Sequence, residues 1–208
     1  RPDSASFYNF NGEPVEKELT VLDVGSGDYG KNGMAHFMLK EIFEQPDAVR
    51  RTLGAHIKNG EVAFDFSLFD GNAVRNIKKI CFVACGSAYH AGVAAAAVFR
   101  ALTGIASYAF IASEFRYMEP MTDSSTLVVP ISQSGETADT LASLREAKRR
   151  GARTVGVVNV VDSLIAKECG DVIYTCAGQE TAVATTKGYT TQLAALYMFA
   201  IWFGRELG

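Results

Sequence analysis

Short apolar runs alternate with helix-compatible stretches from about residue 77 to the end of the chain. The apolar runs are 79–84, 107–112, 126–131, 154–159 and 171–175. The main stretches with helical spacing are 89–102, 136–150 and 186–205. Because the apolar runs are continuous rather than alternating, they predict strands that are buried on both faces, joined by right-handed helical crossovers. The pattern therefore predicts a three-layer αβα sandwich around a five-stranded, parallel, doubly wound sheet.

The first 76 residues follow a different pattern. Residues 1–35 are rich in glycine, which favours an extended arm or linker. From residue 36 onward apolar side chains recur at helical spacing, so we expect a helical lead-in over 36–76 before a sheet core over 77–208. Pro46 is expected to divide this lead-in into two helices, because proline breaks a helix interior and suits a first turn.

Composition narrows the class of protein. The chain has 208 residues, and 20 Lys and Arg against 23 Asp and Glu give a formal net charge of −3. This balance lacks the basic excess that is typical of proteins that bind nucleic acid. Hydrophobic residues make up 48% of the chain, which is enough apolar material for a core and argues against long disordered regions.

Membrane and metal-binding classes are also disfavoured. The longest apolar run, 193–203, is about half as long as a membrane-spanning helix, and the N-terminus has no apolar segment typical of a secretory signal. We therefore expect a soluble, cytoplasmic protein with no membrane contact. The four cysteines and three histidines show no spacing typical of a metal site, so neither a metal nor a cofactor is expected.

One glycine motif in the arm resembles a nucleotide-binding loop. Gly25, Gly27 and Gly30 match the Gly-x-Gly-x-x-Gly pattern of methyltransferases that bind S-adenosylmethionine. Such a loop needs a helix and then a second buried strand that ends in an acidic residue about 20 positions on. Here a helical pattern follows and no comparable strand comes before residue 79. A glycine hinge is therefore favoured, and cofactor binding is the alternative.

The strongest chemical signal lies between the third predicted strand and the helix after it. Residues 131–137 have the sequence Ile-Ser-Gln-Ser-Gly-Glu-Thr, with three hydroxyl side chains around one glycine. Together with the free N–H groups of a helix N-terminus, these form a neutral cradle for an anion such as a phosphate monoester. Without the lysine of a Walker loop, the site would hold a phosphate rather than transfer it. The alternative is that Ser132, Ser134 and Thr137 only cap the helix.

Two further turns end strands of the same predicted sheet, and ligands bind such sheets at the carboxyl ends of strands. In the first, Gly86 permits a tight turn, and Cys85 is interpreted as a wall of the pocket. A nucleophilic thiolate, with one of the three histidines as its base, is the alternative role for Cys85. The last turn holds Thr185 and Thr186, which are candidates to cap the C-terminal helix. Lys187 in the same turn is expected to be solvated, and the alternative is a cation that pairs with an anionic ligand.

These turns carry the pattern of a known family. The sequences Cys85-Gly-Ser, Ser132-Gln-Ser-Gly-Glu-Thr-Ala-Asp-Thr and 180–192 resemble the sugar isomerase (SIS) domain of the glutamine:fructose-6-phosphate aminotransferases, or glucosamine-6-phosphate synthases. Two more stretches, 36–46 and 112–117, are similar to segments of the same family. The five matches occur in the family's order, and the resemblance covers about residues 5–208. It implies the SIS fold, which is flavodoxin-like.

The resemblance also implies a reaction and a set of site residues. Family enzymes use glutamine nitrogen to convert fructose 6-phosphate to glucosamine 6-phosphate. By resemblance, the residues that would hold the sugar phosphate are Ser132, Gln133, Ser134 and Thr137. Those that would line the sugar are Cys85, Gly86, Ser87, Val183 and Thr185.

Two positions depart from the family pattern. Ala88 stands where the family usually has another hydroxyl residue, so one phosphate contact of the family has no hydroxyl group here. Thr185 replaces the commoner serine and keeps the hydroxyl group.

Other parts of the family enzymes would lie outside this chain. These enzymes have an N-terminal glutaminase domain and two SIS halves, and the second half and C-terminal tail supply the acid, base and Schiff-base residues. The chain is expected to be the first SIS half, with a glutaminase tail and hinge in 1–35 and no catalytic residue of its own. Expected partners are a hexose 6-phosphate (fructose or glucose 6-phosphate), the other domains and a second copy in a homodimer. The alternative is a free-standing sugar-phosphate sensor.

Overall fold

The computed structural model describes residues 6–16, 30–118 and 122–208. They belong to two compact units, which lie within 1–33 and 34–208 and are described separately. Gly25 and Gly27 of the glycine motif lie outside the described residues.

Residues 6–16 of the smaller unit contain a short antiparallel hairpin. Its strands are β1 (Phe7–Tyr8) and β2 (Pro14–Val15). Asn9 closes the turn, because its Oδ1 accepts hydrogen bonds from the N–H groups of Asn11 and Glu13, at 2.9 and 3.0 Å. Residues 6–16 of the predicted arm therefore have local structure of their own.

The larger unit is built on a five-stranded parallel sheet, as the apolar runs predict. The strands lie in the order β6-β5-β7-β8-β9. Their bounds are β5 Lys79–Ala84, β6 Ala106–Ile111, β7 Thr126–Ser132, β8 Arg153–Val158 and β9 Asp171–Tyr174. Every residue of the central strand β7 is buried, which agrees with a strand covered on both faces.

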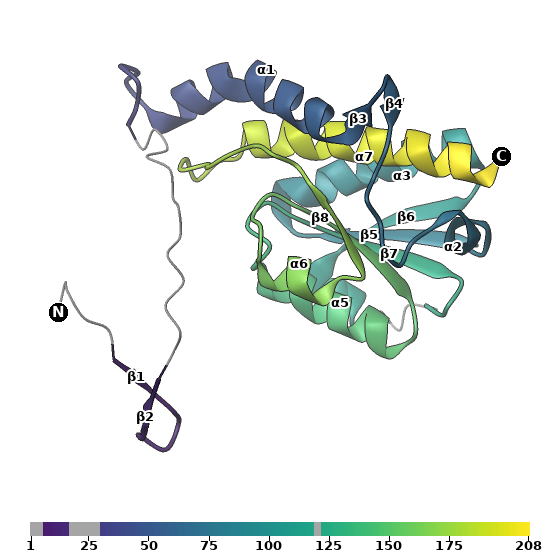
Figure 1. Cartoon of the computed structure of the whole chain (residues 1–208), viewed down its shortest axis with the longest axis horizontal. Coiled ribbons are helices and arrows are strands. Elements are labelled where there is room, and N and C mark those ends of the chain that lie inside the picture. Colours follow the sequence, from purple (N-terminus) through teal and green to yellow (C-terminus); the bar gives the residue numbers. More distant parts are fainter. Residues whose placement is uncertain (1–5, 17–29, 119–121) are drawn as a thin grey trace. The chain divides into compact units, whose positions relative to one another are not determined.

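Helices cover both faces of the sheet and complete the predicted three-layer αβα sandwich (Figure 1). One face carries α3 (Gly86–Thr103) and α7 (Lys187–Leu207), and the other carries α5 (Ala138–Arg149) and α6 (Leu164–Glu168) with α4 (Ala112–Phe115) beside α5. No helix among the described residues has the length and apolar content needed to span a membrane.

The lead-in contains one long helix, α1 (Phe37–His56), which lies along α7 (Figure 1). The expected division at Pro46 is therefore wrong. A proline has no N–H group for the carbonyl four residues earlier, which here belongs to Ile42. The side chain of Gln45 replaces that donor, since its Nε2 donates to the Ile42 carbonyl at 3.1 Å. The Ile42 carbonyl thus keeps a hydrogen-bond donor, and the helix runs through Pro46 without a break.

The buried face of α1 is largely polar. Its buried residues are Lys40, Glu41, Ala48 and Thr52. The apolar side chains of Leu39, Ile42 and Phe43, which predicted the helix, are 38%, 40% and 64% exposed. The helical period was correct, but the side that packs on the rest of the unit is the polar one.

A hairpin and a short helix follow α1 within the lead-in. The strands β3 (Ile57–Lys58) and β4 (Glu61–Val62) pair through the turn Asn59-Gly60, where both residues have positive φ angles of 55° and 83°. Asparagine followed by glycine is the preferred sequence for this two-residue turn. The helix α2 (Gly71–Arg75) begins at Asp70, whose Oδ1 accepts from the N–H of Ala73 at 2.8 Å.

Candidate functional site

The first of three loops at the carboxyl edge of the sheet joins β5 to α3. Cys85 is the N-cap residue of α3, and Gly86 follows with a φ angle of 57°. This left-handed conformation favours glycine, so the predicted tight turn is confirmed. A Cβ atom at Gly86 would meet no other heavy atom within 4 Å, and Ser87 is exposed. The turn therefore faces open space at the start of an 18-residue helix.

The second loop, between β7 and α5, brings its three hydroxyl groups together. The Oγ of the buried Ser132 lies 2.9 Å from Oγ1 of Thr137 and accepts from the N–H of Gly135 at 3.0 Å. The Oγ of Ser134 accepts from the N–H of Glu136 at 3.2 Å. Thr137 is the N-cap residue of α5, yet its side chain caps no backbone N–H group of the helix. These hydroxyls therefore order the loop itself, and do not act as conventional caps of α5.

Gly135 fits the second loop against the neighbouring segment. Its φ angle is 70°, and a Cβ atom there would lie 2.0 Å from Oγ and 2.4 Å from Cβ of Ser163. Such distances are impossible for real atoms, so a larger residue would push the loop and Ser163 apart. Glycine is required here by both its backbone conformation and the space available.

The third loop leads from β9 into α7, and a carboxylate caps the helix. Oε1 of Glu180 accepts from the N–H groups of Thr186 and Gly188 at 2.8 and 3.2 Å, and Oε2 accepts from the hydroxyl of Thr185 at 2.9 Å. Thr185 and Thr186, the candidates for capping α7, do not cap it with their side chains. A carboxylate satisfies two N–H groups at once and complements the positive end of the helix dipole.

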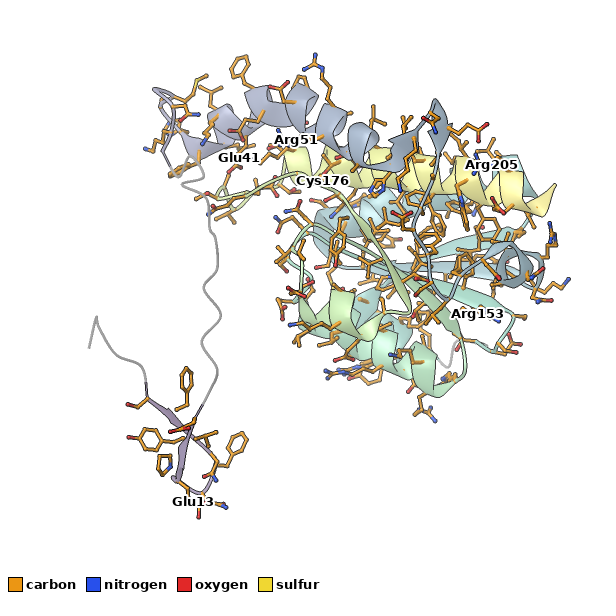
Figure 2. The ribbon with its side chains drawn as sticks, in the orientation of Figure 1. Glu13, Glu41, Arg51, Arg153, Cys176 and Arg205 are labelled. Carbon is orange, nitrogen blue, oxygen red and sulfur yellow. The ribbon has the colours of Figure 1, made fainter. Side chains whose placement is uncertain are left out.

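The lead-in helix α1 holds this third loop from outside. The buried carboxylate of Glu41 accepts from the N–H groups of Thr181 and Ala182 at 2.6 and 3.1 Å. The guanidinium of Arg51 donates to the carbonyl of Cys176 at 3.3 Å, and Figure 2 shows both residues where α1 passes the strand exit. Each contact joins residues more than 120 positions apart, so α1 fixes the loop through tertiary contacts.

Lys187, in the first turn of α7, is buried instead of solvated. Its side chain is 5% exposed, and Nζ pairs with Oε2 of Glu44 on α1 at 2.6 Å. The expectation of a solvated lysine is wrong, because the polar face of α1 supplies a buried partner. This cation is therefore bound to a carboxylate of the same chain.

The three loops surround one cleft of about 380 Å³. All nine predicted site residues line it: Cys85, Gly86, Ser87, Ser132, Gln133, Ser134, Thr137, Val183 and Thr185. Four further lining residues are Ala88, Ile131, Ala184 and Gln192. None of the lining residues within the described part of the chain is charged. Val183 stands at this cleft with its apolar side chain fully exposed.

A neutral cleft can still hold an anion. The helices α3 and α5 begin at its wall, and the first N–H groups of a helix have no partner within the helix. These groups and the loop hydroxyls can surround a phosphate, which the positive ends of the helix dipoles also favour. None of the three histidines, all within the described residues, lines the cleft, so Cys85 has no imidazole base beside it there.

Sequence reasoning missed three polar residues around the cleft, namely Glu41, Glu180 and Gln192. The two carboxylates hold the third loop, and Gln192 is a buried residue of α7 that lines the cleft. One feature of the sequence could have identified Gln192: it lies beside the apolar run 193–203, where a buried amide needs a hydrogen-bond partner. Nothing in the neighbouring sequence marks Glu41, whose partners lie 140 residues away.

Comparison with known proteins agrees with this architecture. Residues 73–202 match the SIS domain family. The chain belongs to the SIS domain family. The matched segment begins within α2 and ends within α7, so it contains the whole sheet and all nine predicted site residues.

The relatives of this SIS domain are much longer than the chain. A glutamine–fructose-6-phosphate aminotransferase of Clostridium acetobutylicum is 47% identical over 205 residues, which cover 98% of this chain and 34% of that protein. The same enzyme of Symbiobacterium thermophilum is 46% identical over 209 residues, covering 100% and 34%. The chain thus spans about a third of the length of these curated relatives.

A solved structure supports the same relationship. The C-terminal domain of glucosamine-fructose-6-phosphate aminotransferase from Francisella tularensis matches with a TM-score of 0.81 at 40% identity, over 86% of this chain and 50% of that one. The resemblance of this SIS domain to the aminotransferases, predicted from its motifs, is confirmed.

Proposed function

We propose that this SIS domain binds a hexose 6-phosphate, as the first half of the isomerase region of a glutamine–fructose-6-phosphate aminotransferase. One observation carries the proposal: three loops far apart in sequence meet at one neutral cleft rich in hydroxyl groups and helix N-termini. The similarity to aminotransferases over almost the whole chain supports fructose 6-phosphate or glucose 6-phosphate as the ligand.

The two ends of the ligand would meet different walls. The phosphate would accept hydrogen bonds from Ser134, Thr137 and the first N–H groups of α5, where the helix dipole stabilises its charge. The sugar would lie between the first loop and the third, near Ser87, Thr185 and Val183. A sugar ring against Val183 would give this exposed apolar side chain a contact that it lacks in the free chain.

Turnover would need residues outside the chain. The cleft contains hydroxyls, amides and one thiol, and no carboxylate, histidine or lysine among its described lining residues. It can therefore bind and orient a sugar phosphate, but it offers no lysine for Schiff-base formation and, apart from the Cys85 thiol, no group suited to proton transfer. We propose that these groups come from a second SIS half, with a glutaminase domain supplying ammonia and a homodimer as the assembly.

Calorimetric titration with fructose 6-phosphate and glucose 6-phosphate tests the proposal. Both should bind. Fructose without a phosphate group should bind much more weakly, because it makes no contact with the hydroxyl and N–H groups of the second loop. Ser134→Ala should weaken hexose-phosphate binding, whereas Ser113→Ala, a matched serine on α4 away from the cleft, should not. Binding of S-adenosylmethionine with no binding of either sugar phosphate would overturn the proposal.

The sensor alternative predicts the same binding, so turnover separates it from the aminotransferase. The chain should be mixed with the C-terminal half of a related isomerase region. If the chain is the first half of an isomerase, the mixture should convert fructose 6-phosphate to glucose 6-phosphate, which neither half does alone. A sensor would bind the ligand without any gain of turnover.

A further inference from the structure

Gln192 is a buried residue whose side-chain amide has no hydrogen-bond partner among the described residues. It lies in the second turn of α7, is 3% exposed and lines the cleft. No hydrogen bond joins its side chain to any residue that the structure describes. The neighbouring Thr191 behaves differently, because its hydroxyl donates to the carbonyl of Lys187 at 2.8 Å. Among the described residues, the fully enclosed side-chain polar atoms that lack a partner belong to Thr140, Ser163 and Thr186 and not to Gln192. The amide of Gln192 therefore opens onto the cleft, where a ligand can reach it.

The sheet places this amide away from the phosphate cradle. Ile131, near the end of β7, packs into the apolar cluster that contains Leu196 of α7. Successive side chains of a strand point to opposite faces, so Ser132 turns to the other side, where it contacts Thr137 at the start of α5. Gln192 therefore approaches the cleft from the α7 side, which is also the side of the third loop.

We propose that the side-chain amide of Gln192 hydrogen-bonds a hydroxyl group of the bound sugar and is a specificity-determining residue for the polyol part of the ligand. This rests on the proposed function, in which the cleft takes a hexose phosphate. An amide both donates and accepts, as a sugar hydroxyl does. It is also neutral, so it adds no repulsion to a phosphate dianion held by the opposite wall.

Affinities of the 208-residue chain for fructose 6-phosphate and for inorganic phosphate test this role. Gln192→Leu keeps the size of the side chain and removes the amide. It should weaken fructose 6-phosphate binding by about 3- to 10-fold, the effect of one hydrogen bond, and leave phosphate binding unchanged. The matched variant Ser134→Ala, in the phosphate cradle, should weaken the binding of both ligands.

Three outcomes separate the two proposals. Equal affinity of Gln192→Leu and the unchanged chain for fructose 6-phosphate would overturn the role of Gln192 and leave the proposed function standing. Equal loss of affinity for both ligands would also overturn it, because the amide would then not act on the sugar. If the unchanged chain binds no hexose phosphate, the proposed function itself fails.

A measurement on the unchanged chain covers the case in which the variant does not fold. In the ¹⁵N-labelled chain, the side-chain NH₂ resonances of Gln192 should shift when fructose 6-phosphate is added. They should not move with inorganic phosphate. Resonances that move with neither ligand, while the backbone resonance of Ser134 shifts, would overturn the inference.

Discussion

The carboxylate of Glu41 accepts a 2.6 Å hydrogen bond from the backbone N–H of Thr181, 140 residues further along the chain. The same carboxylate accepts from Ala182 at 3.1 Å, and it is 2% exposed. A helix that precedes the sheet thus fixes the loop that carries Val183, one wall of the cleft. The loop's shape therefore depends on a buried charge from a remote segment.

Glu41→Ala should lower the free energy of unfolding by about 2 kcal/mol, because two buried N–H groups lose a charged acceptor. It should also weaken hexose-phosphate binding through disorder of the third loop. Chemical denaturation and calorimetric titration measure the two effects. Asp47→Asn, on the exposed face of the same helix, is the control and should change stability by less than about 0.5 kcal/mol. Equal stability of the two variants would contradict the assignment.

Gly135→Ala should destabilise the second loop by at least about 2 kcal/mol, because it adds strain at positive φ and a collision with Ser163. Binding of the phosphate should fall as well. The double variant Gly135→Ala with Ser163→Gly removes both colliding atoms and should recover part of the stability. Additive losses in the double variant would show that the collision is not the cause.

The two serines of the second loop should separate into different roles. Ser132→Ala removes the acceptor for the N–H of Gly135 and should lower both stability, by about 1 kcal/mol, and affinity. Ser134→Ala changes an exposed hydroxyl and should lower affinity with little effect on the melting temperature. A larger stability loss for Ser134→Ala than for Ser132→Ala would reverse these assignments.

The four free cysteines should differ in the rate at which iodoacetamide alkylates them. Burial raises the pKa of the Cys81 thiol to about 11 and that of Cys169 to about 12, so both stay protonated at pH 8. Cys85, half-buried at the cleft, should react faster, and a bound hexose phosphate should protect it. Peptide mapping by mass spectrometry measures each rate, with Cys176, outside the cleft, as the unprotected control. Equal protection of Cys85 and Cys176 would argue against ligand binding in the cleft.

Lowering the pH should remove the contribution of the Glu146 carboxylate to the stability of the folded chain. Hydrogen bonds from Arg149 and Arg150 lower the pKa of Glu146 from 4.5 to about 2. A lowered pKa in the folded chain stabilises it above the unfolded value, and the effect is lost as the pH falls from about 4.5 toward 2. Glu146→Gln should therefore cost about 0.5 kcal/mol at pH 7 and progressively less between pH 4.5 and 3 in denaturant unfolding. A difference that stays constant over this range would exclude the mechanism.

The sheet and the positions of the loops could be predicted from sequence because they follow from local patterns. A continuous apolar run such as that of β7 is typical of a strand that other elements cover on both faces. Hydroxyl residues directly after such runs must then lie at the carboxyl edge of the sheet. This reasoning brings residues from three separate loops to one cleft without knowledge of any contact between them.

The polar support of the cleft could not be predicted in the same way. A helix with exposed Phe43 and buried Glu41 contradicts the usual pattern, and only the N–H groups of a distant loop make the arrangement stable. Glu180 caps α7 although it lies six residues before the N-cap residue Thr186. Sequence rules for capping consider the N-cap residue itself and therefore do not identify Glu180. Both carboxylates act through tertiary contacts, which leave no local trace in the sequence.

The segment that matches the SIS family begins at residue 73, but Glu41 and Glu44 lie on α1. A protein cut at the family boundary would keep every residue of the cleft wall and lose the acceptors of Thr181, Ala182 and Lys187. The smallest unit that keeps the cleft with its supporting contacts is therefore longer than the matched SIS segment, by α1 and the β3–β4 hairpin. A segment that is grafted into another protein to transfer this cleft would have to include residues 34–72.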